Sequence, residues 1–246
     1  MTCQTFYEKL LTYIRKDVRG KTLSVDEFNE LIPVVNYELY NHFYSQWEES
    51  QVASDALLPW KRFNQDLDIT SNKVALTGGD FATYPYQHLI GRPRRSSDTV
   101  FDVVTALEYS ERYGDALTQP TISDPVCFVA DNDGVPTLYT YPDTVSDIYI
   151  DYLVSPTDPF LDYYINDTTY VVTYMADGAT GVSIPSGSTY RDGTAGATTK
   201  DSQTHDIEFS DEHEGLLLDL FLAKLGLQTR DPMVVEYANM EQAKKV

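Results

Sequence analysis

The chain has 246 residues, 42% of them apolar and 13% aromatic, which suffices for one large domain or two small ones. It contains no apolar run of about 18 residues, and its charged N-terminal stretch lacks an apolar core, so we expect neither a membrane-spanning helix nor a signal peptide. The two cysteines, Cys3 and Cys127, provide neither a disulfide framework nor a zinc quartet, and they favour a reducing compartment.

The formal net charge is −20, and it is unevenly distributed. Residues 1–95 hold 12 acidic and 11 basic side chains, whereas residues 96–246 hold 26 acidic and 7 basic ones. Affinity for nucleic acid comes mainly from Lys and Arg side chains that replace counterions, so the acidic part argues against DNA binding. Acidity of this kind instead favours solubility, a basic partner or hard cations.

The first elements are predicted to be two helices. Apolar residues recur at helical spacing over residues 6–14 and again after Ser24. Ser24 and Glu27 have the spacing of a capping box, which marks the start of the second helix. Because Pro33 lies inside the second apolar pattern, we expect a kink or a break there. The sequence thus predicts an N-terminal helical hairpin.

From about Asp66 the apolar period changes to two, which predicts short strands. Between two of them, Asn132-Asp133-Gly134 has the chemistry of a hairpin turn, and the spacing of its acidic residues does not match a calcium loop. A local helix is predicted over Ala106–Gly114. The predicted strands are Val74–Leu76, Val100–Val104, Val126–Ala130, Thr137–Tyr141, Ile148–Val154, Tyr170–Tyr174 and Ile207–Phe209.

The last part of the chain begins with a segment that is rich in Gly, Ser and Thr. This segment, residues 176–204, contains few large apolar side chains and is predicted to be a long loop or an extended hairpin. Helical periodicity returns after the acidic start Ser210–Glu212, with a leucine stripe on the following residues. Asp231-Pro232 then has the pattern of an N-cap followed by proline, which predicts a final helix.

These elements together predict an α+β fold. The simplest way to bury the apolar stripes of the helices is to pack those of the two chain ends on each other. We therefore expect a helical bundle from both chain ends, residues 1–65 plus 205–246. Residues 66–204 would form an inserted antiparallel β-rich domain, with the long loop or hairpin at 176–204.

Motifs of catalysis or cofactor binding are not apparent. No nucleophile elbow, Walker or dinucleotide-binding sequence is present, and His213-Glu214 is not followed by a second histidine one turn on. His205, Asp206, Asp211 and His213 could gather around a metal, but their order is more typical of a loop that enters a capped helix. With 38 acidic residues, close carboxylate pairs are inevitable and not diagnostic. We expect no catalytic residue, no cofactor and no metal site.

A basic segment separates the nearly neutral part from the acidic part. It contains Arg92, Arg94 and Arg95, and it is interpreted either as a solvated loop or as a docking arm for the carboxylates of a neighbouring subunit, because arginine makes bidentate contacts. The chain also has 19 tyrosines, which suit surfaces buried on association but also occur on half-buried sheets.

The order of several motifs along the chain resembles that of a known family. They are LSVDEFNELI after the first predicted helix, YPYQHLIGRP, the Glu-Tyr…Glu-Arg-Tyr…Gln-Pro-Thr…Asp-Pro run at 108–125, the Asp-Tyr-Leu-x-x-Pro-x-x-Pro run at 151–159 and the helix start FSDEHEGLLLDL. Over nearly its whole length the chain is similar to head-to-tail connector proteins, the neck-ring or adaptor proteins of short-tailed bacteriophages, and most of all to those of crAss-like phages.

This resemblance implies a structural virion protein of the neck or tail that is not an enzyme and is made in the bacterial host cytoplasm. It implies a ring of about twelve copies that joins the portal protein to adjacent neck or tail proteins, without a membrane partner. Genomic DNA would pass through the ring without sequence-specific binding, and an acidic lumen would keep the DNA from adhering. Arg92, Arg94 and Arg95 would then meet acidic residues of the neighbouring subunit.

Two other interpretations stay open. The chain could be an acidic surface or receptor-binding module whose loop at 176–204 contacts a partner. It could also be a carboxylate-based hydrolase, which the lack of a catalytic pattern makes the weakest of the three. A ring protein should assemble or dock on its portal, whereas an isolated binding module would remain monomeric.

Overall fold

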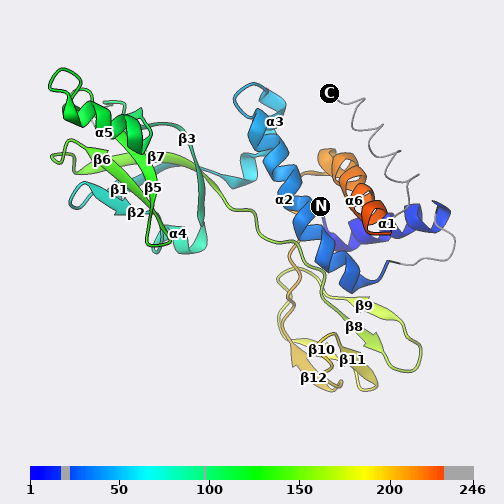
Figure 1. Ribbon diagram of the computed structural model, residues 1–246. Helices are drawn as coiled ribbons and strands as arrows, with labels where there is room; N and C mark the ends of the chain where they lie inside the picture. Colours follow the sequence, from blue (N-terminus) through cyan, green and yellow to red (C-terminus); the bar gives the residue numbers. More distant parts are fainter. Residues whose placement is uncertain (18–22, 97, 230–246) are drawn as a thin grey trace. The chain divides into compact units, whose positions relative to one another are not determined.

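The computed structural model describes residues 1–17, 23–96 and 98–229 (Figure 1). The described chain is a mixed α+β protein whose sheets are mainly antiparallel. It divides into two compact units. The terminal unit comprises the described parts of Met1–Pro59 and Pro156–Val246, and the inner unit comprises Trp60–Ser155. None of the described helices is both long and apolar enough to cross a membrane.

The helices of the terminal unit come from both ends of the chain. The predicted capping box is confirmed, because Ser24 and Glu27 cap the second helix reciprocally. The helix continues through Pro33, so it is not broken there, and the expected kink stays a prediction. The elements are α1 (Cys3–Asp17), α2 (Val25–Gln46), α3 (Gln51–Ala56), the 3-10 turns η1 (Leu58–Trp60, which leads into the inner unit) and η2 (Asp211–His213), and α6 (Glu214–Thr229).

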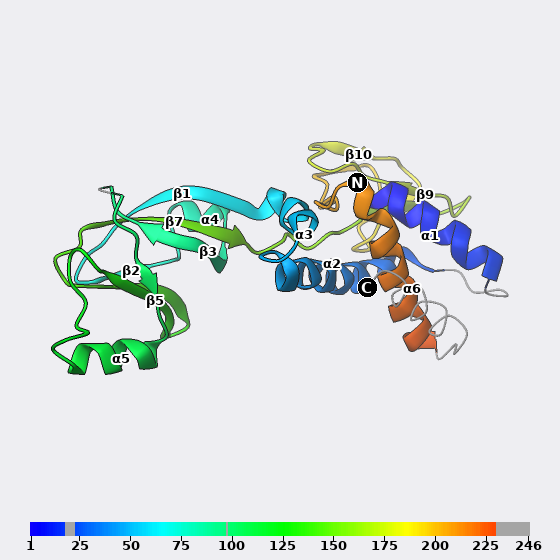
Figure 2. The same ribbon diagram turned by 90° about the horizontal axis from the view of Figure 1, so that it is seen from above.

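The helices α1, α2 and α6 lie beside one another in the terminal unit (Figures 1 and 2). Three phenylalanine rings join them. The ring centroids of Phe6 and Phe28 are 6.3 Å apart. The ring centroid of Phe221 lies 6.2 Å from that of Phe6 and 5.6 Å from that of Phe28. All three side chains are fully buried, so this contact forms part of the hydrophobic core. The helix expected from Asp231 lies outside the described residues, and a complete helical bundle from both chain ends stays a prediction.

Short antiparallel strands complete the terminal unit. One sheet has the strand order β11-β8-β9, and a separate ladder pairs β10 with β12. The segment at 176–204 is therefore neither a plain loop nor one extended hairpin, because its strand β11 pairs with β8, which precedes the segment in the chain. The strands are β8 (Tyr163–Asn166), β9 (Val172–Tyr174), β10 (Val182–Ile184), β11 (Ser188–Tyr190) and β12 (Thr198–Lys200).

Direct contacts tie these strands to the N-terminal helices. The side-chain amide of Asn29 on α2 donates to the Leu161 carbonyl at 3.0 Å and accepts from its N–H at 2.9 Å. The Tyr163 hydroxyl donates to Asp26, and the Tyr7 ring meets the Tyr174 ring edge to face at 5.9 Å. These contacts place the chain after residue 155 with the helices. The inserted unit is thus Trp60–Ser155 and not the expected 66–204.

The inner unit contains two sheets and two short helices. The strand orders are β1-β7-β3 and β2-β6-β5-β4, and only the β4–β5 pair of these sheets is parallel. Side chains of β7 at Ile148, Ile150 and Tyr152 are fully buried and form the core of the first sheet. The elements are β1 (Lys61–Asp68), β2 (Lys73–Ala75), α4 (Asp80–Thr83), β3 (Tyr86–Arg94), β4 (Asp102–Val103), α5 (Ala106–Gly114), β5 (Val126–Asn132), β6 (Val135–Tyr141) and β7 (Asp147–Val154).

The predicted hairpin and the predicted local helix in this unit are confirmed. Asn132 pairs with Val135, so Asp133 and Gly134 form a two-residue turn. Both have positive φ, at 56° and 82°, as the favoured hairpin turns with a right-handed strand twist require. The helix α5 has the predicted bounds.

In the terminal unit, by contrast, the predicted strand at 207–209 is absent, because these residues have no strand partner in the described chain.

Candidate interaction surface

The three arginines singled out in the sequence lie at the end of β3, where the strand is interrupted. The register between β3 and β7 shifts between Ile90 and Arg94, which is a bulge. Gly91 has φ of 70°, a conformation that glycine adopts without strain, and a Cβ atom there would lie 4.0 Å from an oxygen of Asp151 on β7. The bulge therefore brings the backbone of β3 close to this carboxylate.

A second bulge lies on β1, the other edge strand of the same sheet. The register with β7 shifts between Arg62 and Gln65, and the N–H of Asn64 in this bulge donates to Asp151 at 2.7 Å. The adjoining Phe63 is exposed, with 60% of its surface accessible. Bulges on edge strands twist the edge away from regular pairing, so they leave side chains available without offering a bare strand edge.

The arginines differ in their surroundings. Arg95 is partly buried and its guanidinium lies 3.7 Å from Asp147, so this side chain serves the inner unit itself. Arg94 is exposed and donates to the Asn64 side chain across the sheet. Arg92 is exposed and forms no ion pair with another described residue. The structure thus separates the predicted docking residues into Arg95, which is engaged internally, and the outward pair Arg92 and Arg94.

A second exposed surface follows directly after these residues in the chain. Helix α5 begins at a capping box in which Thr105 and Glu108 bond reciprocally. These hydrogen bonds lower the pKa of the Glu108 carboxyl. On α5 itself, Arg112 forms an ion pair at 2.8 Å with Asp102 of β4, which fixes the helix to the sheet. The helix is therefore well defined at its start and along one side.

Aromatic stacking attaches α5 to the four-stranded sheet. The ring of Tyr109 stacks on that of Tyr141, with centroids 4.0 Å apart, and lies 5.3 Å from the Phe128 ring. Tyr109 is only partly buried, and no residue of α5 is fully buried. Within the inner unit, Figure 2 shows α5 lying along β5 with its other side uncovered. The helix is held through Tyr109, through a longer contact of the Tyr113 ring with Tyr141 at 6.4 Å, and through the ion pair of Arg112.

The remaining sides of α5 and the loop after it expose apolar side chains. Leu107 is 71% exposed, and Leu117 in the following loop is 94% exposed. Large exposed apolar groups that gather in one segment are typical of interaction surfaces, because water exposure costs free energy that association recovers. We call residues 100–122 the apolar arm. Its exposed large apolar residues are Val100, Val103, Leu107, Tyr113, Leu117 and Ile122.

The helical pattern of this segment was visible in the sequence, but its exposure was not. Tyr109 and Tyr113 lie one turn apart, and the sequence predicted a local helix over Ala106–Gly114. A helix with these residues can pack into a core or lie on the surface, and the sequence alone does not distinguish the two. The nearby glycine and proline signals after the helix are the only hint of an exposed arm.

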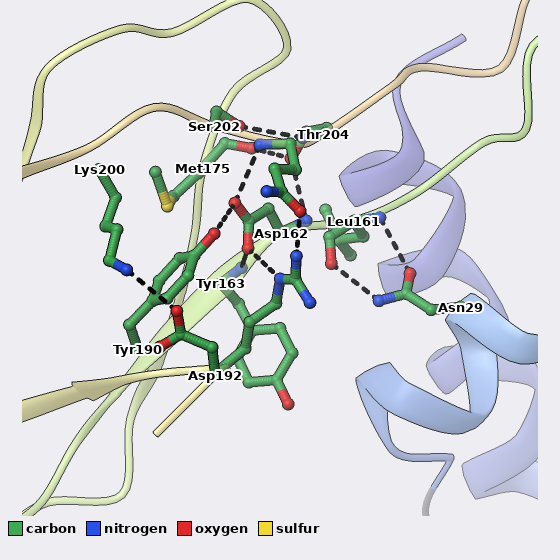
Figure 3. Close-up of polar contacts among 12 residues, drawn as sticks. Asn29, Leu161, Asp162, Tyr163, Met175, Tyr190, Asp192, Lys200, Ser202 and Thr204 are labelled. Carbon is green, nitrogen blue, oxygen red and sulfur yellow. Dashed lines mark hydrogen bonds and ion pairs between the residues drawn. The ribbon is translucent and has the colours of Figure 1, made fainter. Parts of the chain in front are cut away.

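The most connected buried polar group lies in the terminal unit (Figure 3). Asp162 is fully buried and accepts from the Tyr190 hydroxyl at 2.6 Å and from Arg191 Nε at 2.8 Å. It also accepts from the backbone N–H groups of Tyr163 at 2.9 Å and Gln203 at 3.0 Å. Because four donors surround the carboxylate, it cross-links β8, β11 and the chain after β12 and leaves no free lone pair for a substrate.

Burial and contact with carboxylates change the acidity of the tyrosines around Asp162. Burial, with the hydrogen bond to Asp162, raises the pKa of Tyr190 to about 12. Burial also raises the pKa of Tyr163 to about 12, with a further contribution from its bond to Asp26. Both phenols therefore stay protonated near neutral pH and act as hydrogen-bond donors.

The histidine and acidic residues considered as metal ligands have separate partners. Asp206 accepts from the N–H of Cys3 at 2.9 Å, and Asp211 lies 3.7 Å from the N-terminal ammonium group. The ring of His213 bonds to Ser210 and meets the Phe43 ring edge to face. Within residues 1–17, 23–96 and 98–229, no three His, Cys, Asp or Glu side chains are grouped as metal ligands.

The two cysteines are buried and unpaired by disulfides. Burial raises the pKa of Cys3 to about 12, with a further contribution from Asp206. Burial likewise raises the pKa of Cys127 to about 12, with a further contribution from Asp102. A thiol with such a pKa holds almost no thiolate at neutral pH, so neither side chain has the character of a nucleophile.

Comparison with known proteins gives no family assignment: no protein-family model matches the chain, and no curated protein has significant sequence similarity to it.

Proposed function

We propose that the chain is a structural virion protein that forms a ring in the neck of a short-tailed phage. The ring would join the portal to the tail and let genomic DNA pass through its lumen. The observation that carries this proposal is the apolar arm, whose exposed side chains require a partner surface to remove them from water. The resemblance in motif order to neck-ring proteins supports the phage neck, next to the portal, as the place of this assembly.

The distribution of charge supports a conduit. The chain has 38 acidic and 18 basic residues, so a lumen formed from its acidic part would repel phosphate and leave DNA mobile. The same charge makes subunits repel each other, and apolar contact area or arginine pairs must offset this repulsion in a ring. The apolar arm supplies apolar contact area, and the outward pair Arg92 and Arg94 supplies arginines that can pair with carboxylates.

The proposal is tested by the mass of the assembled protein. Purified protein alone and together with its portal protein should give closed rings in sedimentation and in cryo-electron micrographs. A chain that stays monomeric at high concentration and does not bind the portal would contradict the proposal. Portal or terminase genes next to its own gene would support the setting independently.

An acidic surface or receptor-binding module is the second candidate. The feature that favours it is the turn between β8 and β9, where Tyr170 is 79% exposed at φ of 56° and Val171 is also exposed. Side chains of Asn166 and Thr169 bond within this turn and fix its shape. A fixed aromatic tip can contact a receptor, and a monomer that binds a host surface through this tip would favour the module over the ring.

A further inference from the structure

We infer that the apolar arm of one copy docks on the outward pair Arg92 and Arg94 of a second copy. This inference rests on the proposed ring and names the surfaces that would build it. Both surfaces belong to the inner unit, so each copy carries one of each. A contact between two different surfaces is head-to-tail, and a head-to-tail contact generates a ring when its rotation closes.

The docking side of the arm is defined by the helix geometry. Leu107 and Glu111 lie one turn apart and therefore share a face of α5, whereas Tyr109 and Arg112 face the sheet. Both outer residues are exposed, and Glu111 forms no ion pair with another described residue. Leu117 follows in the loop as the most exposed large apolar side chain of the described chain. The arm thus presents Leu107 and Glu111 on one face of α5 and an exposed Leu117 in the loop that follows.

The receiving surface has the complementary chemistry. Arg92 and Arg94 provide exposed positive charge on the bulge of β3, and Phe63 provides an exposed apolar ring on the bulge of β1. Both bulges approach the same residue of the central strand, Asp151, which brings these two parts of the sheet together. A guanidinium group can bond a carboxylate in a bidentate manner while its planar face lies on apolar groups.

The charge of the two segments selects a second copy of this chain as the occupant. Residues 100–125 carry five acidic side chains and one arginine, and that arginine already pairs with Asp102. In the acidic part of the chain, Arg112 is the only basic residue between Arg95 and Arg191. The arm therefore has no arginine partner of its own beyond that pair, while the segment directly before it supplies two exposed ones. Opposite potentials on two surfaces steer such an encounter and fix its register.

Charge reversal at the two exposed residues tests the contact. Glu111→Arg and Arg92→Glu should each raise the concentration needed for half-assembly by about tenfold or more, because each places like charges opposite one another. An equimolar mixture of the two variants should assemble again, since every contact in an alternating ring then joins opposite charges. Mass photometry and sedimentation at low salt measure both effects.

Matched variants keep the test specific. Glu49→Arg makes the same charge change at an exposed position of the terminal unit and should leave assembly unchanged. Leu117→Ser should weaken assembly, whereas Val52→Ser, at a side chain that is 70% exposed on α3, should not. Circular dichroism of each variant confirms that the fold is retained, which is expected because all five positions are exposed.

The outcomes separate this inference from the proposed function. Suppose that the unchanged protein forms rings. If both charge variants then assemble as well as it does, or if their mixture assembles as poorly as each variant alone, the docking contact is wrong, while the proposed ring is not contradicted. If the unchanged protein forms no ring with or without its portal, the proposed function is wrong, and the docking contact falls with it.

Discussion

The phenol ring of Tyr109 stacks on that of Tyr141 at a centroid distance of 4.0 Å, and this contact anchors a helix in which no residue is fully buried. Most surface helices bury an apolar stripe, and their stability comes mainly from that packing. Here the apolar contacts with the sheet are those of the Tyr109 ring and a longer one between the exposed Tyr113 ring and Tyr141, at 6.4 Å, so the position of α5 depends mainly on Tyr109.

Replacement of Tyr109 by alanine should therefore detach α5 from its sheet. We expect Tyr109→Ala to lower the free energy of unfolding by about 2 kcal/mol and to speed amide exchange over residues 106–114. Tyr113→Ala, at a more exposed position of the same helix, should change the stability by less than about 1 kcal/mol. Equal effects of the two variants would show that the stack is not the anchor.

The capping box makes α5 sensitive to acid. Hydrogen bonds from Thr105 lower the pKa of Glu108 in the folded protein below its ordinary value of 4.5. A lowered pKa contributes stability that is present above the ordinary value and is lost as the pH falls through the folded one. Amide exchange of α5 should speed up below about pH 4.5. Thr105→Ala should weaken this pH dependence, because it removes the hydroxyl that bonds Glu108 but keeps the backbone N–H, and it should cost about 1 kcal/mol at pH 7.

The buried carboxylate of Asp162 should be required for the strands of the terminal unit. Asp162→Asn replaces an acceptor oxygen by an NH2 group that faces donors, so we expect a loss of about 2–4 kcal/mol in a denaturant titration. Asp192→Asn removes a carboxylate that pairs with Lys200 at 2.9 Å but is 42% exposed, and it should shift the denaturant midpoint much less than Asp162→Asn does. Similar losses in both variants would contradict a special role for Asp162.

The two buried thiols predict a loss of stability in alkali. The pKa values of Cys3 and Cys127 are raised from 9.0 to about 12 in the folded chain, so the unfolded chain releases these protons first as the pH rises. Their contribution to stability is complete below pH 9.0 and is lost progressively up to about pH 12. The urea midpoint should fall across this window, and less steeply in a Cys3→Ala/Cys127→Ala variant. An unchanged slope in that variant would exclude the thiols as the cause.

Local sequence signals predicted those elements whose stability is mainly local. The capping box at Ser24, the helix over Ala106–Gly114 and the turn at Asp133-Gly134 depend on neighbours within a few residues, and all three are present. The strand β1 was missed because its sequence, KRFNQDLD, is polar, and its pairing with β7 joins residues far apart in the chain.

The residues of the candidate surface were likewise predicted from the sequence only in part. Sequence reasoning found Arg92, Arg94 and Arg95 as a basic segment, but only the fold separates Arg95, which lies beside Asp147, from the outward pair. The apolar arm could not be foreseen, because exposure depends on which side of α5 the sheet covers. The unit boundary was missed for a related reason, since one side-chain amide, that of Asn29, binds a residue more than a hundred positions later.

The contact between Tyr7 and Tyr174 has a consequence for biosynthesis. A nascent chain emerging from the ribosome contains the whole inner unit before any of the strands that cover α1 and α2 has been made. The inner unit is therefore the first that can reach its native structure, and the N-terminal helices must wait with their apolar faces incompletely covered. In the cell, this interval is when chaperones would be needed most.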